Sequence, residues 1–170
     1  MSSDPISRLS AADAGEIYTL QLAAYVSQGH LHDDYQIPPL VQTFEELVEE
    51  LADPSVIALG IRQDGRLVAS VRLHVQGATA ELGRFTVAPD LVGQGLGTRL
   101  EAAVDEALPA GVERIELFTG DKGVDNLRLY ARLGYAEDRR ESVGTYELVF
   151  LSRQRTNRVS PSAPPAASAG

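Results

Sequence analysis

Three glycines at alternate positions stand where the pattern of the chain changes from strand to helix. The stretch LVGQGLGTRL places Gly93, Gly95 and Gly97 after a β-rich run and directly before apolar residues at helical spacing. A glycine-rich turn that leads into a helix is an anion site, because unpaired backbone N–H groups and the positive end of the helix dipole point the same way. We therefore expect this turn to bind phosphate.

The spacing of these glycines narrows the kind of phosphate ligand. A dinucleotide fold uses G-x-G-x-x-G, and a P-loop uses G-x-x-x-x-G-K-[ST]. Here Thr98 stands in the place of the third Rossmann glycine, and no lysine follows. The sequence therefore disfavours a nucleotide-binding protein.

Length and composition indicate one domain. The chain has 170 residues, of which 44% are hydrophobic, enough for one core and too few for two domains of ordinary size. We assign the domain to residues 1–151. The segment 152–170 is rich in Ser, Ala, Pro and Arg, which predicts a disordered tail or a frayed extension without a role.

Charge and cysteine content exclude several classes of function. A formal net charge of −9 disfavours a nucleic-acid partner and favours cationic substrates. With no cysteine there is neither a disulfide framework nor a thiol nucleophile. No signal peptide and no run of about 18 apolar residues is found, so we expect a cytoplasmic protein without a membrane partner.

Hydrophobic periodicity predicts an α/β domain. Hairpins must be antiparallel and strand–helix–strand crossovers parallel, so the sheet is expected to be mixed. In chain order we expect a strand at 6–9, a helix capped by Ser10 or Asp13, a loop over HLHDDYQIPPL, a helix with a Thr43–Glu46 capping box, three strands with a hairpin turn at Asp64-Gly65, a helix after the glycine turn, the strand VERIELFTG, the helix VDNLRLYARLGY and the strand VGTYELVFL.

Three motifs in this order carry a family resemblance. LGRFTVAPD at 82–90, VGQGLGTRLEAAV at 92–104 and NLRLYARLGY at 126–135 resemble the GCN5-related N-acetyltransferase (GNAT) family. The resemblance implies the GNAT (acyl-CoA N-acyltransferase) fold, with a mixed, mostly antiparallel sheet and helices on both faces. It implies an N-acetyltransferase that moves acetyl from acetyl-CoA to a primary amine of a small molecule or peptide by direct attack. The alternative is a catalytically inactive acyl-CoA binding or sensing module, and a homodimer is a further expectation.

The same resemblance assigns the residues that hold coenzyme A. Val92 stands where the family usually has Arg or Gln, which predicts weaker binding that Arg99 compensates. The backbone of the strand would pair with the pantetheine arm, and the glycine turn would hold the pyrophosphate. The implied contacts are Phe85, Thr86 and Val87 on the strand, Gly93, Gln94, Gly95, Leu96, Gly97 and Thr98 in the turn, and Asn126 and Tyr130 on the later helix.

Acetyl transfer to an amine needs a base for the amine proton and an acid for the leaving thiolate. An alkyl amine with a pKa of about 10.4 is protonated at neutral pH. Glu81 occupies a position where related enzymes often keep a carboxylate that acts through water, so it is either the general base or a solvated strand residue. Tyr130 is either the general acid at the sulfur or a core tyrosine.

The stretch HLHDD offers four potential metal ligands, His30, His32, Asp33 and Asp34, but a single short loop seldom completes a coordination shell. We therefore expect no metal. In GNAT proteins the segment between the first two helices commonly lines the acceptor site, so Asp33, Asp34 and Tyr35 are expected to receive the cationic amine. The alternative is an exposed acidic loop.

Overall fold

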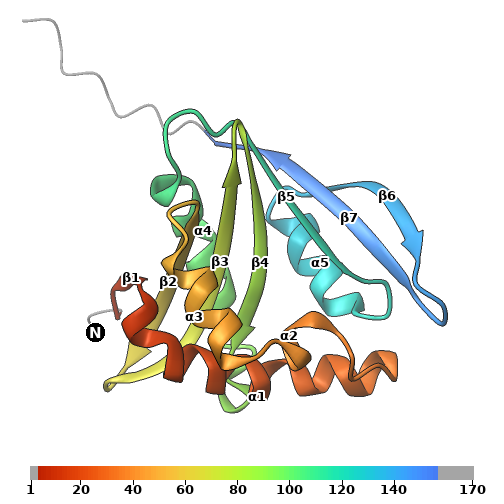
Figure 1. Cartoon of the computed structure of the whole chain (residues 1–170). Helices are drawn as coiled ribbons and strands as arrows, with labels where there is room; N and C mark the ends of the chain where they lie inside the picture. The colour runs from red at the N-terminus through yellow and green to blue at the C-terminus, as the bar shows by residue number, and fades with distance from the viewer. Residues whose placement is uncertain (1–3, 157–170) are drawn as a thin grey trace, which may run out of the picture.

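A computed structural model describes residues 4–156 of the chain (Figure 1). In chain order its elements are β1 (Ile6–Leu9), η1 (Ala11–Asp13), α1 (Ala14–His32), α2 (Pro38–Val41), α3 (Phe44–Ala52), β2 (Val56–Gln63), β3 (Arg66–Gln76), β4 (Thr79–Val87), η2 (Pro89–Leu91), α4 (Leu96–Ala107), β5 (Arg114–Gly120), α5 (Val124–Arg132), β6 (Ala136–Ser142) and β7 (Glu147–Gln154).

The strands form one seven-stranded sheet in the order β1-β2-β3-β4-β5-β7-β6. All neighbours are antiparallel except β4 and β5, which run parallel. Figure 1 shows α1 and α3 in front of the sheet and α4 and α5 behind it. The expected mixed, mostly antiparallel sheet with helices on both faces is thus confirmed.

The parallel pair β4–β5 is short. Its register runs only from Thr79 opposite Arg114 to Glu81 opposite Glu116, after which the strands separate, and Figure 1 shows them diverging. The backbone of β4 beyond Glu81 therefore has no strand partner on this side within residues 4–156. This opening divides the sheet into two halves.

The core lies on both faces of β2, β3 and β4. One layer is closed by α1 and α3, and the other by α4. The fully buried side chains that fill these layers are Ile17, Leu47, Ile61, Val68, Val71, Leu73, Leu100, Val104, Val112 and Ile115.

The helix caps and the first hairpin agree with the sequence predictions. Ser10 and Asp13 form one capping box, and Thr43 and Glu46 form the other. At the β2–β3 turn Asp64 and Gly65 both have positive φ, 50° and 82°, as a two-residue hairpin requires.

The loop predicted over HLHDDYQIPPL is wrong at both ends. Helix α1 continues through His32 and ends at Asp33, whose φ of 50° is left-handed. Pro38 and Pro39 begin the short helix α2. Proline suits the first helical position, because its fixed φ is helical and its missing N–H has no partner there anyway.

The C-terminal strands also differ from the prediction. Strand β6 was missed because all seven of its residues are exposed, so it carries no apolar alternation. Strand β7 continues to Gln154, past the expected domain boundary at 151. Arg153 holds this end through ion pairs to Glu101 at 2.6 Å and Asp105 at 3.0 Å, which composition alone does not reveal. The predicted tail beyond 156 lies outside the described residues.

Candidate active site

A β-bulge distorts β4 where it faces the opening. Ser70 pairs with Thr86 and Arg72 with Gly83, so two residues, Arg84 and Phe85, stand opposite one. Arg84 has a φ of 51°, in the left-handed region. Such a backbone is uncommon for a residue with a side chain, and bulges of this kind often lie beside active sites. The bulge turns the unpaired stretch of β4 toward the opening.

The strand residues predicted to pair with pantetheine lie along this stretch. Phe85 and Val87 are half-buried, while the buried Thr86 hydroxyl lies 2.8 Å from that of Ser70. Their side chains are thus engaged in packing, and the backbone edge remains for a ligand. Their role stays a prediction.

The glycine turn is exposed and leads directly into α4. Gly93 and Gly95 have φ values of 84° and 80°, and no side chain caps the helix. Leu96, Gly97 and Thr98 form the first helical turn, whose N–H groups have no intrahelical partner. Gln94 is exposed in the turn. The turn therefore offers the backbone donors that an anion site needs.

Two residues beside the turn bear on its polar contacts. Val92 is 70% exposed and offers no polar group. The guanidinium of Arg99 donates a hydrogen bond to the backbone carbonyl of Asp4, near the start of the described chain. This bond occupies part of the group expected to compensate for Val92, so the backbone carries most of the expected anion binding.

Close packing joins α4 to the bulge. A Cβ at Gly97 would lie 2.9 Å from the ring of Phe85, so only glycine lets the helix approach this near. The ring of Phe85 in turn meets that of Tyr130 edge-on, with centroids 6.4 Å apart. The glycine turn, the bulge and α5 thus meet at one place.

Tyr130 lies almost buried on α5, with 8% of its surface exposed. Its ring packs against Phe85 and Tyr135, and burial raises the pKa of its hydroxyl. Within residues 4–156 this hydroxyl has no hydrogen-bond partner. It is therefore a protonated donor that remains free for a ligand. Asn126 lies one turn earlier on the same face of α5.

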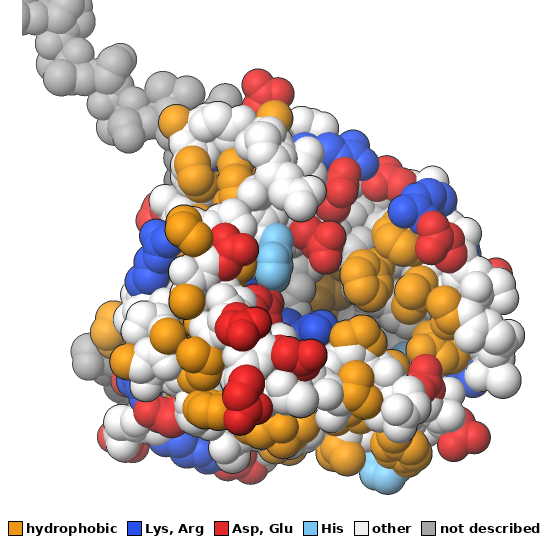
Figure 2. Space-filling view, in the orientation of Figure 1, with side chains coloured by type: hydrophobic (Ala, Val, Ile, Leu, Met, Phe, Trp, Pro, Cys, Tyr) orange, Lys and Arg blue, Asp and Glu red, His pale blue; other side chains and the backbone are white. Residues whose placement is uncertain are grey.

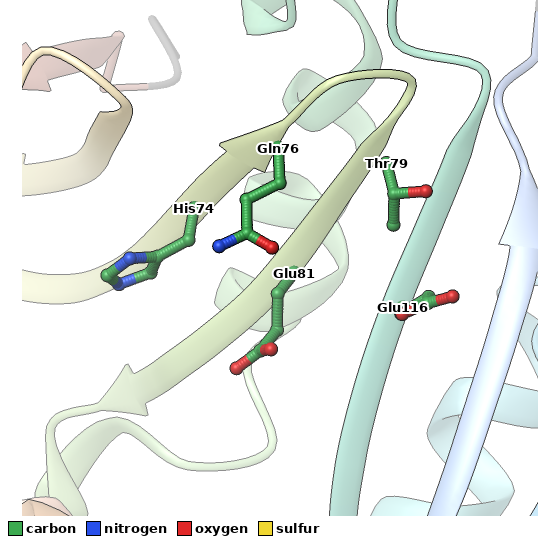
Figure 3. A pocket seen from close by; sticks show the side chains of 5 residues that line it. All are labelled: His74, Gln76, Thr79, Glu81 and Glu116. Atoms are coloured by element: carbon green, nitrogen blue, oxygen red, sulfur yellow. The ribbon is translucent and has the colours of Figure 1, made fainter.

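Glu81 lines a pocket of about 190 Å³ at the point where β4 and β5 join (Figure 3). It pairs with His74 on β3 and with Glu116 on β5. Gln76 and Thr79 complete the lining. The side chain of Glu81 is exposed, which suits a carboxylate that accepts a proton through water.

A buried ion pair lies beside this pocket. The guanidinium of Arg72 donates to Glu50 of α3 at 2.8 Å, and its Nη2 donates to Gln21 of α1 at 2.8 Å and to Gln42 at 3.3 Å. Arg72 is 1% exposed. The network ties α1 and α3 to the sheet.

The same carboxylate holds His74, whose Nε2 lies 2.9 Å from Glu50. Burial alone would raise the pKa of Glu50, but the His74 hydrogen bond and the Arg72 charge lower it to about 2. The hydrogen bond that His74 donates to Glu50 raises the pKa of His74. The two groups therefore attract each other most strongly in mildly acidic solution.

We predict that His74 stabilises the fold in a pH-dependent way. Its raised pKa means that its contribution is complete below the usual value of 6.5 and is lost as the pH rises through the folded value. The partner Glu50 contributes above 4.5 and loses its effect only toward about 2. His74→Gln should therefore lower the melting temperature more at about pH 5.5 than at about pH 9. An equal loss at both pH values contradicts the prediction.

The residues predicted to receive the amine are held by other contacts. The carboxylate of Asp34 accepts from Tyr146 and from the Gln36 backbone, each at 2.9 Å. The Tyr35 hydroxyl lies 2.6 Å from Nδ1 of His30. Asp33 ends α1. These residues fix the α1–α2 loop, and the lining of the Glu81 pocket comes from other residues, so their role at the acceptor stays a prediction.

The remaining histidine of HLHDD points into the fold. His32 is 4% exposed, and its ring packs at a tilt against that of Tyr146, with centroids 4.6 Å apart. A Cβ at Gly120 would lie 2.0 Å from its Nε2, so α1 and β5 meet here. His30, His32 and Asp34 of HLHDD thus contact different partners.

Sequence reasoning missed two residues near the bulge. Tyr25 of α1 has its hydroxyl at the backbone N–H of Phe85, and burial raises its pKa although Arg84 and Arg72 oppose this. Arg84 itself lies on β4, and its Nε is buried without a hydrogen-bond partner. The sequence does offer a signal for Arg84, because it is the one charged residue in the stretch LGRFTV. It offers no comparable signal for Tyr25.

Figure 2 shows the face that carries this site. Acidic side chains and a histidine surround a hollow near its middle, and basic surface lies within the hollow. Within residues 4–156 no helix combines the length and the apolar character needed to cross a membrane.

The sequence matches the model of a known protein family. A model of the acetyltransferase (GNAT) family matches residues 16–135. The mycothiol acetyltransferase of Clavibacter michiganensis is 29% identical over 133 residues, which are 78% of this chain and 42% of that protein. The IAA acetyltransferase of Azospirillum brasilense is 31% identical over 93 residues, 53% of this chain and 61% of that protein. The chain thus spans less than two thirds of the length of each of these relatives.

Solved structures share the fold. The ribosomal-protein-S18-alanine N-acetyltransferase of Escherichia coli superposes with a TM-score of 0.73 over 94% of this chain and 99% of that one, at 20% identity. The PaiA N-acetyltransferase of Thermoplasma acidophilum, solved with coenzyme A, superposes with a TM-score of 0.71 over 90% of this chain and 99% of that one, at 16% identity.

Proposed function

The chain belongs to the GNAT acetyltransferase family, whose members use acetyl-CoA as co-substrate, and we propose that it acetylates a primary amine of a small molecule or peptide. The observation that carries this proposal is the opening between β4 and β5. There an unpaired strand edge, the exposed glycine turn at α4 and the free hydroxyl of Tyr130 meet.

Acetyl-CoA fits this arrangement along its length. Backbone N–H groups of the glycine turn and of the first turn of α4 would hold the pyrophosphate, since both Gly93 and Gly95 need positive φ and leave space for phosphate. The pantetheine amides would pair with the backbone of Phe85, Thr86 and Val87 as an added strand does. The thioester would then lie beside Tyr130.

The proposed chemistry is direct transfer in one step. Glu81 accepts the proton of the ammonium group through water, which frees the nitrogen lone pair. The nitrogen attacks the thioester carbonyl, so that the N–C bond forms and the C–S bond breaks, and the second proton of the nitrogen passes to water as the amide forms. Tyr130 donates its proton to the departing sulfur and recovers one from water. Its raised pKa keeps it protonated until the thiolate forms.

The acidic surroundings support a positively charged amine as the acceptor. Glu81 and Glu116 face the pocket, and the chain carries a net charge of −9. Such a field attracts cations on approach. Asp33, Asp34 and Tyr35 are proposed as a more distant part of the acceptor wall.

We predict that acetyl-CoA raises the melting temperature selectively. Ligand at about 100 times its Kd adds roughly 2.7 kcal/mol, or about 5–10 °C for a chain of this size. NAD and ATP serve as controls. Gly95→Val should reduce the shift, because a β-branched residue at a φ of 80° distorts the turn.

Release of free CoA with a panel of amines then tests the transfer itself. Release that depends on the amine supports the acetyltransferase. A melting shift without release from any amine contradicts it and leaves an acyl-CoA binding module. The absence of any shift contradicts the assignment of the glycine turn.

A further inference from the structure

Arg84, a residue of the β4 bulge, carries an unpaired positive charge within residues 4–156. Its Nε is buried and has no hydrogen-bond partner, and no ion pair joins Arg84 to a carboxylate within residues 4–156. Leaving a buried donor unsatisfied is unfavourable, because the N–H group has lost its hydrogen bond to water. The left-handed backbone of Arg84, with a φ of 51°, adds strain. Strain and an unmet donor together are typical of a ligand site.

A second guanidinium lies close by. The charge of Arg84 acts on both Arg72 and Tyr25, so the three groups are neighbours. Arg72 already pairs with Glu50, while Arg84 has no such partner. The two neighbouring guanidinium groups thus have one carboxylate, Glu50, to neutralise them, and it pairs with Arg72. A second carboxylate, supplied by a ligand, would neutralise the charge of Arg84.

The surroundings make this positive charge unusual. The chain as a whole carries a net charge of −9, Glu81 and Glu116 line the pocket where β4 and β5 join, and Glu50 pairs with Arg72 and His74 beside it. Figure 2 shows basic surface within the hollow and acidic side chains around it. A single ligand could thus contact the carboxylates of Glu81 and Glu116 with one end and the guanidinium of Arg84 with the other.

We propose that the amine acceptor also carries a carboxylate, which Arg84 binds with support from Arg72 while the amine faces Glu81. This rests on the proposed acetyl transfer and names its substrate class: a free amino acid or a similar amino-carboxylate. Arginine suits this task because its planar fork binds a carboxylate with two parallel hydrogen bonds.

The spacing along β4 agrees with such a ligand. Glu81 and Arg84 are three residues apart on one strand, about 10 Å between Cα atoms. Both have long side chains, which can reach the two ends of one small ligand. The Tyr25 hydroxyl of α1 meets the backbone N–H of Phe85 in the bulge. The carboxylate would bind on the α1 side of β4, and the thioester on the side of Tyr130.

The test compares each of the common L-amino acids with its amide and its decarboxylated amine. Release of CoA gives kcat/KM, and the melting temperature of the protein with CoA gives binding without turnover. We expect the preferred amino acid to exceed its amide at least about tenfold in kcat/KM, and to stabilise the protein where the amide does not.

Three variants locate the effect. Arg84→Gln should bring the ratio of acid to amide close to one and abolish the stabilisation by the acid. Arg84→Lys should give an intermediate ratio, because lysine keeps the charge and lacks the fork. Arg8→Gln removes the same charge from exposed β1 at the sheet edge and should change nothing. The melting shift with acetyl-CoA checks that each variant is folded.

The outcomes separate this inference from the proposed function. If amides and amines react as well as the acids and Arg84→Gln keeps that ratio, the carboxylate site is refuted and acetyl transfer stands. If Arg84→Gln weakens acetyl-CoA instead, Arg84 serves the co-substrate and the inference fails. If no amine reacts but acids still stabilise the wild type and not Arg84→Gln, the site stands and the transferase fails.

Discussion

Tyr130→Phe is expected to lower the rate of acetyl transfer by at least about tenfold, while the melting shift with acetyl-CoA stays nearly unchanged. The substitution removes one oxygen and keeps the ring. The ring packs edge-on against Phe85 and Tyr135, so the aromatic cluster remains intact. The hydroxyl has no hydrogen-bond partner within residues 4–156, so its removal breaks no contact of the fold.

The effect on rate follows from the proton that the thiolate needs. Burial raises the pKa of Tyr130, so the phenol is fully protonated at neutral pH and available as a donor. Its O–H stabilises the negative charge that develops on the departing sulfur and lies in place to deliver the proton. Without the phenol, water must supply the proton, in a site that the rings of Phe85 and Tyr135 keep largely dry.

Tyr18→Phe is the matched control. Tyr18 lies on α1 and packs against Phe44 at 5.8 Å, away from the opening between β4 and β5. It should keep the wild-type rate. Equal rates for Tyr130→Phe and the wild type would remove Tyr130 from the mechanism. A rate that falls together with acetyl-CoA affinity would make it a binding residue instead.

Local patterns allowed several elements around the candidate site to be predicted. The glycine turn, the cap at Ser10, the Thr43–Glu46 capping box and the Asp64-Gly65 hairpin each depend on a few neighbouring residues, and all of them form as expected. Tyr130 was found because its helix carries a family motif. These features need no knowledge of which strands become neighbours.

The parts that were missed depend on contacts between distant segments. Arg72 meets Gln21 across 51 positions and Glu50 across 22. The bulge at Arg84 arises from the register of β4 against β3, which the sequence of β4 alone does not reveal. A carboxylate in an acidic helical run looks solvated until its partner on another element is known.

The buried network also has a consequence for the site. Gln21 donates to the Pro39 carbonyl at 2.9 Å and to Gln42 at 3.1 Å, so the same network holds the turn between α1 and α3. Arg72 therefore fixes the helix that carries Tyr25. The position of Tyr25 on the acceptor side therefore depends on the buried ion pair between Arg72 and Glu50.

Glu50→Ala is expected to destabilise the fold by about 3–5 kcal/mol, because it leaves Arg72 buried without its counter-charge. Arg72 has 2% of its side chain exposed and Glu50 has 14%, so water replaces the lost partner poorly. His74 loses its partner as well. For a chain of this size the melting temperature should fall by roughly 6–20 °C.

Glu49→Ala on the same helix is the control, since Glu49 is exposed and the same atoms are removed. It should change the free energy of unfolding by less than about 0.5 kcal/mol. The double variant Glu50→Leu with Arg72→Met removes both charges and fills the space, so it should recover much of the lost stability. If the double variant is as unstable as Glu50→Ala, the loss arises from packing and not from an unpaired charge. If Glu50→Ala melts like the wild type, Arg72 is solvated in solution and the network does not fix α1 over the site.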